Sequence, residues 1–93
     1  MRTIKYTKRF KKDFKREKTG RHGKNLDGLL FDVTRLLVSN TELPRKYFDH
    51  SLTGDWHDHR DCHIKPDLVL IYRKPDDETL ELVRLGSHSE LGL

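Results

Sequence analysis

The chain has 93 residues, which is enough for one hydrophobic core and too few for two. Charged residues make up 37% of it and hydrophobic residues 33%, but the hydrophobic residues fall in periodic blocks, which argues against disorder. Cys62 is the only cysteine, so no internal disulfide can form. No apolar run approaches the ~20 residues of a membrane span. We therefore expect one cytoplasmic domain over residues 1–93, with no membrane partner.

Charge divides the chain into two parts. Residues 1–24 carry eleven Lys and Arg against two acidic residues, a local net charge of +9. Residues 25–93 carry eight basic and thirteen acidic residues, a local net charge of −5. Such asymmetry indicates a polyanion, such as a nucleic acid, as partner of the basic part, although a solvated helix face is the alternative.

The basic part begins with a short strand and a helix. The strand is predicted over residues 4–6. A helix is predicted over residues 7–18, with Thr7 as its N-cap. Phe10 and Phe14 lie four residues apart, so they share one buried stripe of this helix.

A second helix is predicted over residues 25–39. Its leucines and valine recur at steps of three and four, which is typical of an amphipathic helix. Two glycines within residues 19–23 separate it from the first helix, and Asn40 and Pro44 end it. The two helices therefore form a hairpin.

The second half of the chain changes to a period of two. Residues 41–60 are predicted to be irregular, with a possible short strand near His50 and a turn at Gly54. Strands are then predicted over residues 60–65, 68–72 and 79–85, followed by a short tail to Leu91. The short turns between them imply antiparallel pairing. The expected fold is α+β: an N-terminal strand and a two-helix hairpin packed on an antiparallel sheet of about four strands.

Five of the six histidines lie in this second half. Histidine titrates near neutral pH, so it can both accept and donate a proton. Cleavage of RNA by its own 2′-hydroxyl needs such groups, because a base must deprotonate the hydroxyl and an acid must protonate the leaving 5′-oxygen. A cation can stabilise the charge that gathers on the phosphate. His50, His63, Asp67 and His88 all lie beside turns or strand ends, where antiparallel strands can bring them together.

A metal site is a rival interpretation of the same region. His57, His59, Asp61 and His63 alternate, so an extended strand would place them on one face, and imidazole and carboxylate suit zinc. The spacing matches no standard zinc motif, and we expect neither a metal nor a cofactor. A nucleophilic role for Cys62 is weaker still, because it lies within a predicted strand as a small packed side chain.

The order of motifs resembles a known family. His-x-Leu-x-Gly at His50, Arg-Asp-x-His-x-x-Pro-Asp from Arg60 to Asp67, and Gly-x-His ending at His88 are similar to the YafQ branch of the RelE superfamily of bacterial toxins. The similarity covers nearly the whole chain, including the opening strand and the basic helix hairpin.

This resemblance implies a type II toxin–antitoxin system whose toxin cuts mRNA in the ribosomal A site without a metal. It implies a catalytic cluster of His50, His63, Asp67 and His88. Our hypothesis is that His50 or Asp67 acts as base, that His88 acts as acid, and that His63 or Arg60 steadies the charge on the phosphate. The implied partners are the 70S ribosome, mRNA and a cognate, DinJ-like antitoxin in a hetero-oligomer. We expect RNA contacts from seven basic residues: Arg60, Lys65, Lys8, Lys11, Lys12, Lys15 and Arg16.

Two departures from the family pattern concern aromatic residues. Leu68 stands where the pattern has tryptophan, and the usual terminal phenylalanine is absent. An aromatic side chain at these positions could stack on a base, so codon preference is open. Two alternatives to the nuclease remain: an RNA-binding module without chemistry, and a gyrase-inhibiting toxin on the same scaffold.

Overall fold

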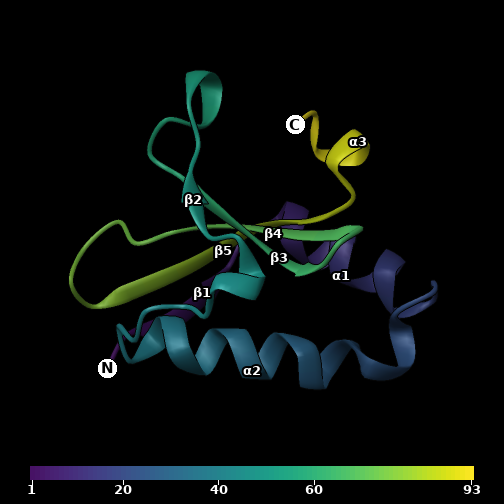
Figure 1. The fold of residues 1–93 in the computed structure, drawn as a ribbon, viewed down its shortest axis with the longest axis horizontal. Coiled ribbons are helices and arrows are strands. Elements are labelled where there is room, and N and C mark those ends of the chain that lie inside the picture. The colour runs from purple at the N-terminus through teal and green to yellow at the C-terminus, as the bar shows by residue number, and fades with distance from the viewer.

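A five-stranded sheet runs through the middle of the computed structural model, which describes residues 1–93 (Figure 1). Its strands are β1 (Thr3–Tyr6), β2 (His50–Ser51), β3 (Arg60–Lys65), β4 (Leu68–Arg73) and β5 (Thr79–Gly86). Their order across the sheet is β1-β5-β4-β3-β2, which puts the apolar β4 in the centre, as its continuous hydrophobic run predicts.

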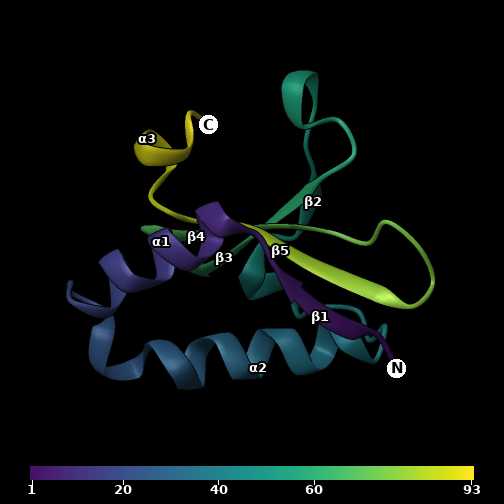
Figure 2. The same ribbon diagram turned by 180° about the vertical axis from the view of Figure 1, so that it is seen from behind.

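Two long helices cover one face of this sheet. They are α1 (Lys8–Lys18) and α2 (Leu26–Val38); Figure 2 shows α2 below the strands from behind, with α1 level with β3 and β4 in this view. Phe10 of α1 and Leu30 of α2 pack with Leu70 and Leu82 of the sheet in the main core. The predicted hairpin is therefore confirmed, whereas of its expected buried stripe Phe10 is buried and Phe14 only partly so. No helix is long and apolar enough to cross a bilayer.

Local signals in the sequence explain where these helices begin and turn. The Thr7 hydroxyl accepts a hydrogen bond from the Phe10 amide at 3.0 Å, which is the expected N-cap of α1. The turn between the helices contains a short 3₁₀ helix, Gly23–Asn25. Gly23 is required there, because a Cβ atom would lie 2.0 Å from the Lys18 carbonyl oxygen.

The other face of the sheet is covered more sparsely. A short helix, α3 (His88–Leu91), lies over it, and Leu91 packs against Val69 and Ile71 in a second, smaller core. Two further 3₁₀ turns, Arg45–Tyr47 and Gly54–Trp56, lie in the irregular segment that flanks β2.

The structure differs from the sequence-based expectation in two respects. The sheet has five strands, because β1 adds to its edge parallel to β5, whereas every other neighbouring pair is antiparallel. The predicted tail is the helix α3. Its capping box pairs the Ser87 hydroxyl with the Glu90 amide and the Glu90 carboxylate with the Ser87 amide, a four-residue pattern that was readable in the sequence.

Candidate active site

Three of the four expected catalytic residues converge on the sheet face that α1 and α2 leave open. His50 begins β2, His63 lies in β3 and His88 begins α3. The His63 ring centre is 4.9 Å from that of His88 and 6.4 Å from that of His50. His63 pairs across the sheet with Val69, which belongs to the smaller core, so its side chain is on the α3 face. Together with Asp61, these residues form what we call the histidine face.

One hydrogen bond of His50, to the Phe48 carbonyl, determines which of its nitrogens carries a proton. Its Nδ1 atom is 2.8 Å from the Phe48 carbonyl oxygen and 3.1 Å from Oδ1 of Asp61. A carbonyl oxygen only accepts, so Nδ1 must be the donor. In the neutral imidazole Nε2 is then unprotonated and available as a base.

Asp61 is the residue of this site that sequence reasoning missed as part of the catalytic group. It is only 2% exposed, and it pairs with His50 in the sheet register. Burial raises the pKa of its carboxyl, whereas the neighbouring His50, His63 and His88 act to lower it. The alternation of Asp61 and His63 along one strand face is the signal that could have found it, although the same pattern also suits the metal alternative.

His63 lies between the other two histidines and is half-buried. Burial lowers its pKa, the nearby Asp61 carboxylate acts in the opposite direction, and His88 and His50 lower it further. A neutral His63 at pH 7 can donate a hydrogen bond to a phosphate oxygen but supplies no full positive charge.

The fixed position of α3 determines where His88 lies. Arg16 of α1 donates to the Leu85 carbonyl oxygen at 2.9 Å and forms an ion pair with Glu90 of α3 at 3.2 Å. Leu91 anchors the same helix in the smaller core. His88 is exposed beside His63 on this short, anchored helix.

Asp67, the fourth expected catalytic residue, makes its contacts elsewhere. It lies in the turn between β3 and β4, and its carboxylate is 2.9 Å from Nε2 of His22 and 3.1 Å from Arg21. The hydrogen bond from His22 lowers the pKa of Asp67. No hydrogen bond, ion pair or ring contact joins Asp67 to the three clustered histidines.

The expected RNA-binding residues fall into two groups. Lys8, Lys11, Lys12 and Lys15 are exposed on α1, and none of them forms an ion pair. By contrast, the Arg16 guanidinium is engaged with Asp13, Glu17 and Glu90.

Near the site, Arg60 and Lys65 also differ. Arg60 makes two hydrogen bonds to the Asp49 carboxylate, which also accepts from the Tyr72 hydroxyl, and the Asp49 bond raises the pKa of Arg60. Lys65 is exposed and has no acidic partner. It is therefore the more available of the two cations for a phosphate.

Two hollows flank the histidine face. One, of about 480 Å³, lies along the part of β3 that β2 leaves unpaired, and we call it the edge groove. The other, of about 500 Å³, lies beneath the loop that carries Trp56, and both His50 and His88 line it. The edge groove is lined by Leu29, Asp32, Lys46, Tyr47, Phe48, His63, Ile64, Lys65 and Pro66.

The residues of the metal alternative do not gather on one strand face. His57 follows a 3₁₀ turn and pairs with Asp58, and His59 packs against Trp56 with ring centres 5.1 Å apart. No group of three His, Cys, Asp or Glu side chains has a geometry that could hold a metal ion. Cys62 is fully buried, and burial raises the pKa of its thiol far above neutral.

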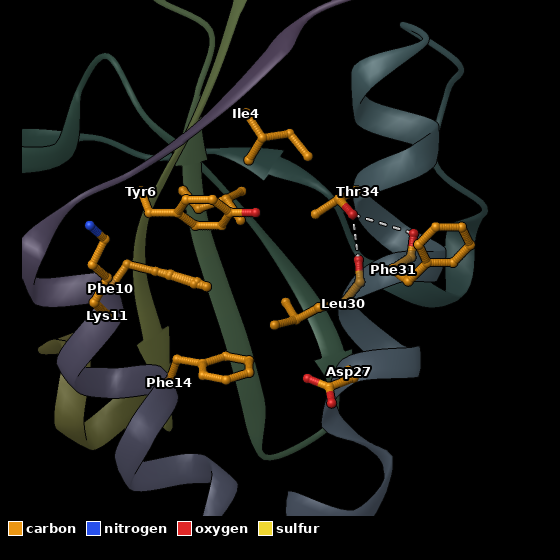
Figure 3. A pocket seen from close by; sticks show the side chains of 10 residues that line it. Ile4, Tyr6, Phe10, Lys11, Phe14, Asp27, Leu30, Phe31 and Thr34 are labelled. Carbon is orange, nitrogen blue, oxygen red and sulfur yellow. Dashed lines mark hydrogen bonds between the residues drawn. The ribbon is translucent and has the colours of Figure 1, made fainter.

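A separate hollow of about 520 Å³ lies between α1, α2 and β1, and we call it the apolar groove. Seven of its ten lining residues are hydrophobic. In Figure 3 the rings of Tyr6, Phe10 and Phe14 face Leu30 across the gap, and Phe31 of α2 is also among the residues that line the groove. Lys11, one of the unpaired lysines, stands at its border.

Comparison with known proteins agrees with this architecture. Residues 2–92 match the family of the bacterial toxin of type II toxin–antitoxin systems, YafQ. The mRNA interferase toxin YafQ of Escherichia coli K12 is 39% identical over 90 residues, which cover 97% of this chain and 95% of that protein.

Two solved structures are also closely similar. A metal-bound toxin from Helicobacter pylori has a TM-score of 0.81 and 45% identity, covering 98% of this chain and 99% of that one. The E. coli DinJ–YafQ complex matches with a TM-score of 0.79 and 34% identity, covering 98% of each chain.

Proposed function

Because this chain belongs to the YafQ family of bacterial toxins of type II toxin–antitoxin systems, we propose that it is an endoribonuclease that cuts mRNA in the ribosomal A site. The observation that carries the proposal is the convergence of His50, His63 and His88 on one open sheet face. The reaction is attack of the RNA 2′-hydroxyl on the adjacent phosphate, with proton transfer by histidine.

We assign the base to His50. Its Nδ1–H bond to the Phe48 carbonyl leaves Nε2 free to take the 2′-hydroxyl proton. Asp61 lies 3.1 Å from the same Nδ1 and stabilises the imidazolium that then forms. Asp61 is thus a positioning residue, because it acts on the substrate through His50.

The acid is His88, which donates its proton to the leaving 5′-oxygen. His63, between the two, donates a hydrogen bond to the phosphate as charge gathers there. Lys65, in the adjacent edge groove, supplies the positive charge that a neutral His63 lacks. Arg60 has a smaller share in this role, because Asp49 already holds its guanidinium.

Asp67 retains a proposed part in catalysis from the family resemblance alone. Its contacts with Arg21 and His22 favour His50 over Asp67 as the base. The variant Asp67→Asn separates the two roles. If Asp67 is the base, the variant loses cleavage outright. If Asp67 only holds the turn, the variant is less stable but the pH dependence of cleavage is unchanged.

The lysines of α1 are the proposed docking surface toward ribosomal RNA. Four unpaired ammonium groups on one helix favour a phosphate backbone without reading its sequence. Affinity for the ribosome in the cytoplasm should therefore fall with rising salt, and each lysine replaced by alanine should reduce the salt slope by about one.

Catalysis is proposed to need no metal, since proton transfer by histidine suffices for this chemistry. The H. pylori relative has been solved with bound metal, so the point needs its own test. The purified chain is therefore stripped with EDTA and then transferred to Mg²⁺ buffer with programmed ribosomes, which need Mg²⁺ to stay assembled. Cleavage that persists supports the proposal, and cleavage that is lost and then restored by an added transition metal contradicts it.

A DinJ-like antitoxin is the proposed partner of the chain, because the related YafQ forms a complex with DinJ. We assign the apolar groove to it. An amphipathic segment can place its apolar side against Phe14 and Leu30, and its acidic side against Lys11 and the neighbouring lysines. This arrangement would cover the docking surface and keep the toxin off the ribosome.

The decisive experiment is cleavage of mRNA on programmed ribosomes, with DNA supercoiling measured in the same extract. The nuclease predicts new RNA ends that disappear with His88→Ala or His63→Ala while the proteins stay folded. Full activity of both variants would refute the catalytic assignment. Loss of supercoiling without new RNA ends would favour a gyrase inhibitor. Salt-sensitive RNA binding without cleavage would favour a binding module.

A further inference from the structure

Phe48 is an exposed aromatic residue at the border of the histidine face. It is 65% exposed, and its ring centre lies 5.7 Å from that of His63. At position 68, where the family pattern has a tryptophan, this chain has a leucine that is fully buried in the core. Phe48 is therefore the only large, exposed aromatic side chain that touches a clustered histidine.

The backbone of Phe48 is held in an unfavourable conformation. Its φ angle is +48°, in the left-handed region that a bulky residue rarely adopts. The surroundings maintain it, because the Phe48 amide donates to the Arg45 carbonyl at 3.0 Å and its own carbonyl accepts from His50. Strain of this kind concentrates at functional sites.

The groove beside Phe48 suits a strand of RNA. Phe48 and His63 line it together with two lysines, Lys46 and Lys65, against one carboxylate, Asp32. Lys65 is exposed and unpaired, so it is free to bind phosphate. An exposed ring next to a cationic groove is the arrangement by which proteins hold unpaired nucleotides.

We propose that Phe48 stacks on a nucleobase of the mRNA next to the phosphate that is cut, and so contributes to choosing where this chain cuts. The proposal rests on the nuclease function proposed above. The stacked base orients its nucleotide along the edge groove, and the adjacent phosphate then lies at His63. Stacking by the ring depends on the presence of the base itself, whereas a lysine that binds a phosphate does not need the base.

The experiment combines protein variants with abasic mRNA on programmed ribosomes. Single-turnover rates are measured over a range of toxin concentrations for mRNAs that lack one base at a time around the cut. Phe48→Ala should raise the half-saturating concentration roughly 5- to 150-fold on intact mRNA, and by less than twofold on the mRNA that lacks the stacked base. Phe48→Trp should retain activity, and Phe48→Leu should behave like alanine.

Phe31→Ala is the matched control, because Phe31 is 64% exposed but lies on α2, where it lines the apolar groove and not the edge groove. It should leave cleavage unchanged. The pH–rate profile tests whether Phe48 instead orients His50. Loss of stacking leaves this profile unchanged, whereas displacement of His50 shifts it.

Failure of the two proposals can be told apart. If the wild-type chain makes no cut on any mRNA, the nuclease proposal fails. If it cuts but Phe48→Ala does so equally well, or loses the same factor on every abasic mRNA, the stacking proposal fails. Unchanged cleavage combined with weaker antitoxin binding would assign the ring to the protein interface and would also overturn it.

Discussion

The edge groove and the apolar groove have similar volumes, about 480 and 520 Å³, but they are built from different chemistry. The apolar groove is lined mainly by aliphatic and aromatic side chains of β1, α1 and α2. The edge groove joins a histidine, two lysines and a strained phenylalanine, and beside it lies the buried carboxyl of Asp61. Unfavourable local features accumulate on the histidine face, as expected where selection acts on chemistry.

The largest effect should come from removing a proton-transfer group on the histidine face. His88→Ala should lower the rate of mRNA cleavage about 10²- to 10⁴-fold, because general acid catalysis contributes that much. Its affinity for antitoxin should stay within twofold of the wild type. Titration against the antitoxin measures this affinity. A large loss of affinity would mean that the histidine face and the apolar groove are not separate surfaces.

A smaller loss of rate is expected for Asp61→Asn, about 10- to 100-fold. The Phe48 carbonyl still fixes the tautomer of His50, so the cost should be below the ~10⁴-fold seen when a triad histidine takes the wrong tautomer. Burial raises the pKa of Asp61, so its ionisation destabilises the fold. Stability is therefore lost as pH rises from about 3.8 through the raised folded-state pKa.

Thermal unfolding between pH 4 and 8 measures this contribution. The pH-dependent loss should be present in the wild type and absent from Asp61→Asn, since asparagine does not ionise in this range. Identical pH profiles for the two proteins would contradict the assignment of Asp61 as a buried, ionising partner of His50.

On the other surface, Tyr6→Ala should weaken antitoxin binding about 30-fold. Tyr6 is 53% exposed on β1 and lines the apolar groove, and a truncated interface anchor costs about 2 kcal/mol. Isothermal titration of the purified variant with antitoxin provides the measurement. Wild-type affinity in a variant that unfolds at the normal temperature would remove the apolar groove from the interface.

The smallest expected effect is a gain in stability. Phe48→Gly should raise the free energy of unfolding by about 1 kcal/mol, because glycine adopts the left-handed region without strain. Chemical denaturation measures it, and Phe31→Gly, within α2, serves as a contrast that should destabilise by a similar amount. A lower stability of Phe48→Gly would mean that the ring packs and is not strained.

The elements of the fold differ in how well they could be predicted from the sequence. Periodicity and capping residues located α1, α2 and the three long strands, because these elements follow local rules. The parallel pairing of β1 with β5 has no local signature, since it joins segments far apart in the chain. The helix α3 was predicted as a tail, although its Ser-x-x-Glu capping box was visible.

Within the site, spacing and family resemblance together selected the three histidines that converge. They did not indicate that the Asp67 carboxylate contacts His22, or that Arg16 and Arg60 are held in ion pairs. Charge composition counts a basic residue as available, whereas only the folded chain shows which acidic groups have reached it. Phe48 was overlooked because its backbone conformation, not its type, distinguishes it.

The edge position of β1 has a consequence for how the molecule folds. The Thr7 hydroxyl that caps α1 also donates to the Val83 carbonyl, 76 residues further along the chain, at 2.7 Å. The β3–β4–β5 meander can close early through short turns, whereas β1 can dock only after β5 exists. Such long-range closure slows folding toward the millisecond-to-second range. Docking of the first strand and its basic helix therefore depends on contacts between the two ends of the chain.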